Sequence, residues 1–166
     1  MSAPAIKSLD KLTSFSQEID ALELLRKRRR SRVKKYPSVS VLVSTVRPDD
    51  LSNLLQQLCA QSLPSFELHL GLHAIKVNTS HKKLIRALER RKVSVNVYSF
   101  DQEKNLGTIL SSLAQSSTGE FIAKMDDDDY YGPEHLRDLL DAALDTGADV
   151  VGRAMNYVYL EPLQLT

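Results

Sequence analysis

The sequence predicts an α/β fold in which a mainly parallel sheet is flanked by helices. From residue 38 onward, short runs rich in β-branched residues alternate with longer segments of helical periodicity. The expected helices carry typical boundary residues, such as Pro48 at the start of one and Gly147 after the end of another. Because strand–helix–strand connections are right-handed, these elements are expected to form a Rossmann-like half-sheet.

Local composition predicts each element in turn. Valines make 39–44 a strand, and alternating apolar and polar residues do the same for 93–98. Ser80 is the expected N-cap of one helix. The expected strands lie at residues 39–44, 66–72, 93–98, 120–125 and 149–152, with a further extended segment at 154–160. The expected helices lie at residues 48–61, 80–91, 105–116 and 133–147.

Residues 1–37 are expected to form an N-terminal arm, and residues 38–166 the main domain. Apolar residues at near-helical spacing predict an amphipathic helix in the arm: Leu12, Phe15, Ile19, Leu22 and Leu25. The basic tract from Arg26 to Lys35 is either a solvated helix end or a surface for anionic lipid headgroups. It lacks the interleaved aromatic residues of single-strand sites, so no nucleic-acid partner is expected.

Length and composition are typical of one globular domain. The chain has 166 residues, of which 42% are hydrophobic, and its net charge is +1. No apolar run approaches the roughly 20 residues that span a bilayer, and no signal-peptide core is present. Cys59 is the single cysteine, which suits a reducing compartment. A cytoplasmic protein is therefore expected, with peripheral contact at the inner face of the membrane as an alternative.

The four consecutive aspartates from Asp126 to Asp129 are the feature hardest to explain as packing. Adjacent carboxylates repel one another, and a hard divalent cation relieves that repulsion through oxygen ligands. The run follows an expected buried strand, and open α/β sheets bind ligands at the carboxyl ends of their strands. The alternative is a solvated acidic turn punctuated by Gly132 and Pro133.

Several common sites are excluded by their missing motifs. The sequence has no glycine-rich dinucleotide or P-loop signature, no zinc-type spacing of Cys and His, and no Gly-x-Ser-x-Gly elbow. A nucleotide diphosphate would therefore not be held by a glycine loop. A metal held by aspartates would neutralise its charge instead.

Four segments in order resemble glycosyltransferase family 2 of the GT-A fold, over roughly residues 38–160. They are the first strand and loop at 41–48, the helix end and second strand at 58–68, Asn105-Leu106-Gly107, and the strand leading into Asp-x-Asp at 117–129. The resemblance implies transfer of a sugar, with inversion, from a donor linked to UDP, GDP or dTDP. It also implies a divalent metal cofactor, Mn²⁺ or Mg²⁺.

The same resemblance implies roles for the aspartates. Asp126 would lie near the ribose and sugar of the donor, and Asp128 would hold the metal that bridges the diphosphate. Asp129 matches a neighbouring position that is commonly acidic in the family, and it would help Asp128 to hold the metal. Asp127 is the variable position and is expected to face solvent.

Thr45 and Arg47 match the family's loop that borders the nucleotide. Arg47 has an alternative role, pairing with Asp49 or Asp50 on the surface. Where the family usually places acidic residues that contact the base, this chain has His73, which either takes over that contact or is an ordinary loop histidine.

The family's catalytic carboxylate comes from an acidic pair well beyond Asp-x-Asp, and the general base of this chain stays unknown. Glu161 is the only acidic residue after Asp149, and we do not assign it that role. The expectation is a donor-binding half that is incomplete at its C-terminus. The alternative is a catalytically incomplete interaction module that reaches a membrane through its basic arm. A nucleotidyltransferase ranks lower, because residues 44–48 lack the glycines of its usual loop.

Overall fold

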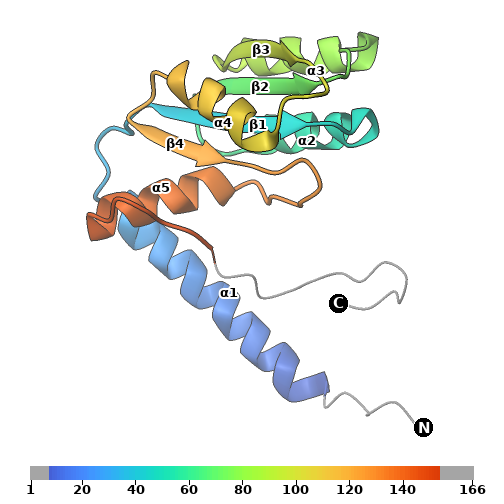
Figure 1. Cartoon of the computed structure of the whole chain (residues 1–166). Coiled ribbons are helices and arrows are strands. Elements are labelled where there is room, and N and C mark those ends of the chain that lie inside the picture. Colours follow the sequence, from blue (N-terminus) through green and yellow to red (C-terminus); the bar gives the residue numbers. More distant parts are fainter. Residues whose placement is uncertain (1–7, 154–166) are drawn as a thin grey trace, which may run out of the picture. The chain divides into compact units, whose positions relative to one another are not determined.

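The computed structural model describes residues 8–153, so the extended segment expected at 154–160 and Glu161 lie outside the described residues. The chain divides into two compact units (Figure 1). One unit is residues 35–137. The other combines the N-terminal segment up to Lys34 with residues from Asp138 onward, which the sequence alone places in the main domain.

A four-stranded sheet forms the centre of the unit at residues 35–137. It consists of β1 (Val39–Thr45), β2 (Glu67–His73), β3 (Ser94–Phe100) and β4 (Phe121–Lys124). The order is β3-β2-β1-β4, and every pair of neighbours is parallel (Figure 1). The parallel α/β architecture predicted from the alternation of strands and helices is confirmed.

The apolar side chains of β1 fill both faces of the sheet. Val41 and Val43 are fully buried, and Leu42 packs on the opposite face with Ile109 and Leu113. β1 lies between β2 and β4, and strands buried on both faces have such continuous apolar runs. Because β1 is paired on both sides, it fixes the positions of the loops that leave the sheet next to it.

Helices α2 (Pro48–Ala60), α3 (Thr79–Arg90) and α4 (Leu106–Gln115) connect the strands. α2 begins with Pro48 in its first turn, as predicted, and buries a leucine stripe: Leu51, Leu54, Leu55 and Leu58. α4 packs on the face that carries Gly71, where an added Cβ would lie 3.0 Å from the Ile109 side chain. That close approach accounts for a glycine inside β2.

The expected N-cap of α3 is wrong by two residues. Asn78, not Ser80, is the cap, and its side chain accepts a hydrogen bond from the His81 backbone N–H at 2.9 Å. The His81 ring in turn accepts from the Asn78 backbone N–H at 3.3 Å. This reciprocal pair satisfies two backbone donors at the start of α3.

The start of α5 and the strand expected at residues 149–152 also differ from the prediction. α5 (His135–Thr146) begins two residues after Pro133, although Gly147 ends it as expected, with a φ of 67°. Residues 149–152 form no strand, and within the described residues no strand follows β4. Val150 is 88% exposed, so its β-branched composition alone does not place it in a sheet.

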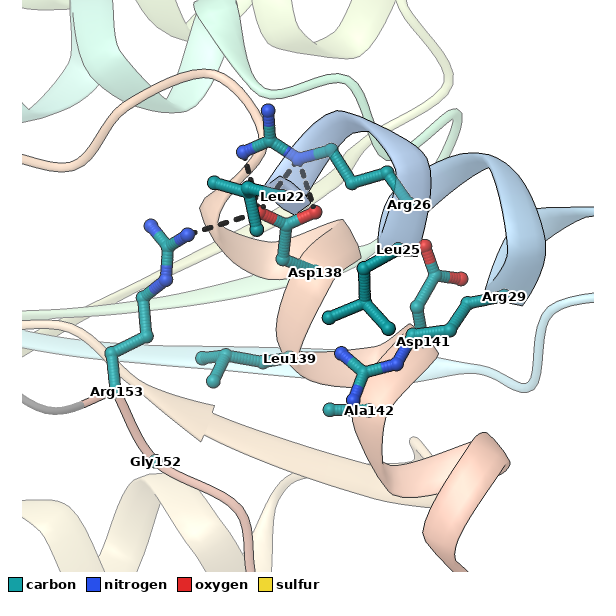
Figure 2. Close-up of a pocket in the computed structure, with 10 residues that line it drawn as sticks. All are labelled: Leu22, Leu25, Arg26, Arg29, Asp138, Leu139, Asp141, Ala142, Gly152 and Arg153. Carbon is teal, nitrogen blue, oxygen red and sulfur yellow. Dashed lines mark hydrogen bonds and ion pairs between the residues drawn. The ribbon is translucent and has the colours of Figure 1, made fainter. Parts of the chain in front are cut away.

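The second unit is held by ion pairs between α1 (Ser8–Arg30) and the aspartates of α5. Asp138 receives Arg26 at 2.6 Å and Arg153 at 3.0 Å (Figure 2). Arg30 lies 3.3 Å from the same carboxylate. Arg30 also contacts Asp141 at 3.1 Å. The series continues at Asp145, which pairs with Arg29 and Arg32 at 3.4 and 2.8 Å. Four arginines of the basic tract are therefore engaged inside this unit.

A small pocket of about 240 Å³ lies beside these pairs (Figure 2). Leu22, Leu25 and Leu139 contribute apolar lining, and Arg26, Arg153 and Asp138 contribute charge. None of the described helices is long and apolar enough to cross a membrane.

A partly buried polar network lies near the beginning of the strands. Glu67 accepts hydrogen bonds from the Ser40 hydroxyl at 2.7 Å and from the Thr118 backbone N–H at 3.1 Å. The ring of His69 is fully buried, with Nδ1 3.0 Å from the Tyr98 hydroxyl. Its Nε2 lies 2.9 Å from Glu67, within ion-pair range but outside hydrogen-bond alignment. Burial raises the pKa of Glu67, but contacts from His69, Ser40 and Thr118 outweigh it and lower that pKa to about 2.

Replacing Glu67 is expected to destabilise the protein in a pH-dependent way. The folded pKa of about 2 lies below the ordinary value of 4.5, so the ionised carboxylate stabilises the fold fully above about pH 4.5. This contribution is lost as pH falls toward 2. Urea unfolding should show Glu67→Gln less stable than the parent by on the order of 2 kcal/mol at pH 7, and the difference should shrink between pH 4.5 and 3. Glu89→Gln, an exposed change on α3, is the matched control, and its stability should equal that of the parent at every pH in this range.

Candidate functional site

The candidate site lies at the carboxyl edge of the sheet, where β1 and β4 end side by side. Leu42 of β1 is in register with Lys124 of β4, and the Met125 backbone N–H donates to the Leu42 carbonyl at 3.0 Å. Met125 is buried, so the aspartate run starts directly from a packed position. This edge is where parallel α/β sheets bind their ligands.

Asp127 is the most constrained of the four aspartates. It is 9% exposed and accepts a hydrogen bond from the Thr45 hydroxyl at 2.6 Å. Its other carboxylate oxygen lies 2.6 Å from Nη1 of Arg47. The expectation that Asp127 faces solvent is wrong, because its side chain turns toward β1 and contacts the buried Thr45 hydroxyl and the Arg47 guanidinium.

The same Arg47 nitrogen lies 2.9 Å from Asp128, whose side chain is 55% exposed. Arg47 reaches Asp50 only at 4.0 Å, so its main partners are the aspartates of the loop rather than its own helix. The structure therefore brings Thr45 and Arg47 together with Asp127 and Asp128.

Asp126 and Asp129 lie on either side of this contact and are connected by Tyr131. The Asp126 carboxylate contacts the Lys124 ammonium group, and its backbone N–H donates to the Tyr131 hydroxyl at 2.8 Å. The same hydroxyl donates to Asp129 at 3.3 Å. Burial raises the pKa of Tyr131 to about 12, and the charges of Asp129 and Asp126 act in the same direction. The hydroxyl therefore stays protonated and donates.

Two glutamine amides at the end of α2 hold the loop that follows the aspartates. Gln57 accepts from the Tyr131 backbone N–H at 2.6 Å and donates to the Asp129 carbonyl at 3.3 Å. Gln61 is fully buried, donates to the Gly132 carbonyl at 3.0 Å and accepts from the Leu136 backbone N–H at 3.1 Å. Neither glutamine was predicted from the sequence to belong to the site. Their spacing of four residues on one helix was the available signal.

The histidines have structural roles where the structure describes them. His69 and His81 are buried. His73, at the end of β2, is only partly buried, and its Nε2 lies 3.0 Å from the Gln102 carbonyl oxygen. Because a carbonyl only accepts, that nitrogen carries the proton.

The aspartates fit a divalent metal that is held only in part by the protein. Among the described residues, no three His, Cys, Asp or Glu side chains are grouped closely enough to form a complete protein site. Asp128 is an exposed hard oxygen donor, and the carboxylate of Asp129 follows it. Mg²⁺ commonly binds one or two carboxylates and completes its shell with water and substrate phosphates. The donor set suits a metal shared with a phosphorylated ligand.

Comparison with solved structures identifies the fold. The S. aureus TarS 1–349 structure shares 23% identity with a TM-score of 0.55, over 74% of this chain and 39% of that chain. The same protein in complex with UDP-GlcNAc shares 24% identity with a TM-score of 0.53, over 74% of this chain and 38% of that one. The mannosyltransferase PcManGT from Pyrobaculum calidifontis, in complex with GDP-Man and Mn²⁺, shares 18% identity with a TM-score of 0.52. The match covers 83% of this chain and 43% of that chain.

These similarities and the parallel sheet define a chain with the GT-A glycosyltransferase fold. The family profile described as glycosyl transferase family 2 matches residues 40–164, and the chain belongs to that family. It spans about two fifths of the length of the structures above. A comparison with curated proteins finds no match.

Tyr131→Phe is expected to loosen the aspartate loop without unfolding the sheet. The change removes the acceptor of the Asp126 backbone N–H and the donor to Asp129, at a cost of about 1 kcal/mol. Hydrogen exchange should show the Asp126 amide exchanging several-fold faster, with the amides of β1 unchanged. Tyr130→Phe, at a side chain that is 84% exposed, is the control. Equal protection of Asp126 in both variants would contradict this role of Tyr131.

Proposed function

We propose that this chain binds a nucleotide-sugar donor as the donor-binding part of an inverting, metal-dependent glycosyltransferase. One observation carries the proposal. In a family 2 chain, Asp127 joins Thr45 and Arg47 of the β1 loop to the aspartate run after β4, so both loops form one polar surface.

Each side chain of this surface has a proposed role. Thr45 and Arg47 border the nucleotide, and Asp126 lies near the ribose and sugar. Asp128, assisted by Asp129, would hold Mn²⁺ or Mg²⁺. When bound, that ion would neutralise the diphosphate and stabilise it as a leaving group. Oxygen donors of this kind match what both ions prefer.

The structural neighbours support a nucleotide-sugar ligand but leave the base open. One neighbour is in complex with UDP-GlcNAc and another with GDP-Man and Mn²⁺. The proposed donor is therefore linked to UDP, GDP or dTDP. We assign no general base within residues 8–153, and the acceptor stays open.

Donor binding is expected to require both the metal and Asp128. Calorimetry with UDP-, GDP- and dTDP-sugars should detect binding of one nucleotide class in the presence of Mn²⁺ and weaker binding with EDTA. Asp128→Ala should weaken binding by about tenfold or more, since even outer-shell changes at metal sites have effects of this size.

Glu89→Ala is the matched control, because it removes one carboxylate from the exposed face of α3. It should bind the donor like the parent. If no nucleotide sugar binds, or if Asp128→Ala and Glu89→Ala behave alike, the proposed function is wrong.

A second candidate function is an interaction module that docks on anionic membrane at the cytoplasmic side. The observation behind it is that some cations of the basic tract are paired with aspartates, whereas others are exposed to solvent. Arg26, Arg29, Arg30 and Arg32 pair with the aspartates of α5, whereas four other cations of the tract are exposed: Lys27, Arg28, Lys34 and Lys35. Each basic residue near an anionic surface contributes about 1 kcal/mol.

Replacing the exposed set by glutamine is expected to reduce vesicle binding by about tenfold or more. Co-sedimentation with phosphatidylserine-containing vesicles should show binding by the parent at 50 mM NaCl and loss at 500 mM, since salt screens such attraction. The control replaces four exposed cations of α3 by glutamine: Lys82, Lys83, Arg86 and Arg90. Absence of binding at every salt concentration would refute the membrane role.

A further inference from the structure

One guanidinium nitrogen at the candidate site has two carboxylate partners. Nη1 of Arg47 lies 2.6 Å from Asp127 and 2.9 Å from Asp128. Asp128 is also the residue proposed to hold the divalent metal. A single carboxylate at the surface of this loop thus has two candidate cations.

The two aspartates hold Arg47 unequally. Asp127 is 9% exposed and is fixed from its other side by the Thr45 hydroxyl at 2.6 Å. Removing its cation would leave a desolvated carboxylate without charge compensation, which is costly. Asp128 is 55% exposed, and water can replace the guanidinium there. Arg47 is therefore retained by Asp127 and exchangeable at Asp128.

Thr45 adds a second restraint on the position of Arg47. Its hydroxyl oxygen accepts from the Arg47 backbone N–H at 3.0 Å while donating to Asp127. The backbone of Arg47 is thus bonded to Thr45 and its side chain to Asp127, and these two partners are bonded to each other. The guanidinium cannot move far from Asp128 without breaking this arrangement.

We propose that Arg47 is a positioning residue that competes with the metal for Asp128, so that the metal binds weakly until the donor arrives. This inference rests on the proposed function and concerns the regulation of the same site. A guanidinium and a divalent ion on one carboxylate repel each other strongly at such distances. A bound diphosphate supplies the negative charge that accommodates both cations. Metal and donor are then coupled, and each raises the affinity for the other.

Manganese binding without any nucleotide provides the test. Calorimetry or electron paramagnetic resonance of the free ion should show Arg47→Gln binding Mn²⁺ about three- to tenfold more tightly than the parent, the range expected for losing one exposed charge contact. Adding UDP or GDP should raise the Mn²⁺ affinity of Arg47→Gln by a smaller factor than that of the parent. Circular dichroism checks that the variant is folded, and Arg47→Met is a second uncharged replacement.

Arg86→Gln is the matched control, because it removes the same charge from exposed α3. If Arg47→Gln gains no Mn²⁺ affinity over Arg86→Gln, including the case in which neither binds, the competition is overturned. The proposed function is judged separately, by whether Asp128→Ala loses donor binding in the parent background. Loss of donor binding in Asp128→Ala together with no gain in Arg47→Gln would refute the competition alone.

The anchoring of the Arg47 guanidinium by Asp127 can be measured separately, by the side-chain ¹⁵N signal of Arg47. In the parent, the Arg47 side-chain ¹⁵N signal should be distinct and should persist when Mg²⁺ saturates the protein, because Asp127 still holds the guanidinium. In Asp127→Asn, that signal should broaden or disappear. A persistent signal in Asp127→Asn would show that Asp127 is not the anchor.

Discussion

The pairing of β1 with β2 on one side and β4 on the other is the constraint on which the rest of this structure depends. It sets Thr45 against Leu72 and Leu42 against Lys124, so the chain leaves neighbouring strands at one edge of the sheet. Parallel strands present their carboxyl ends together, and a ligand site therefore forms from loops that are 80 residues apart in sequence, as Arg47 and Asp127 are. Shifting β4 by one residue would turn its side chains to the opposite face and separate these loops.

The polar contacts at that edge are short, mutually dependent and only partly shielded from water. Thr45, Arg47 and Asp127 form one hydrogen-bonded group, and Tyr131, Gln57 and Gln61 hold the chain that follows. A loop fixed at both ends holds its exposed carboxylate, Asp128, in place before any ligand binds. Such preorganisation reduces the ordering cost of binding.

The sequence was sufficient to predict the four-stranded sheet, because the short apolar run of β1 and the helical spacing of the leucines in α2 are clearly different patterns. The family resemblance placed Thr45, Arg47 and the aspartates at one site, and the structure brings Thr45 and Arg47 to Asp127 and Asp128. The burial of Asp127 could not be predicted, because it depends on which carboxylate the turn directs toward β1. The pairs of Arg26 and Arg30 with Asp138 were hidden for a similar reason, since the partners lie more than 100 residues apart. At Val150 the composition is typical of a strand, but the residue is exposed and residues 149–152 form no strand.

The near-neutral net charge of the chain conceals two opposite local imbalances. Around α5, three aspartates pair with five arginines: Arg26, Arg29, Arg30, Arg32 and Arg153. At the aspartate run, four carboxylates have two cationic partners within the described residues, Lys124 and Arg47. The first cluster needs no further cation, whereas the second has an excess of negative charge at an exposed edge. A divalent ion would remove that excess, but it would also crowd Arg47 unless a further anion bound nearby. The charge balance of the residues themselves thus favours joint binding of a cation and an anionic ligand over binding of the cation alone.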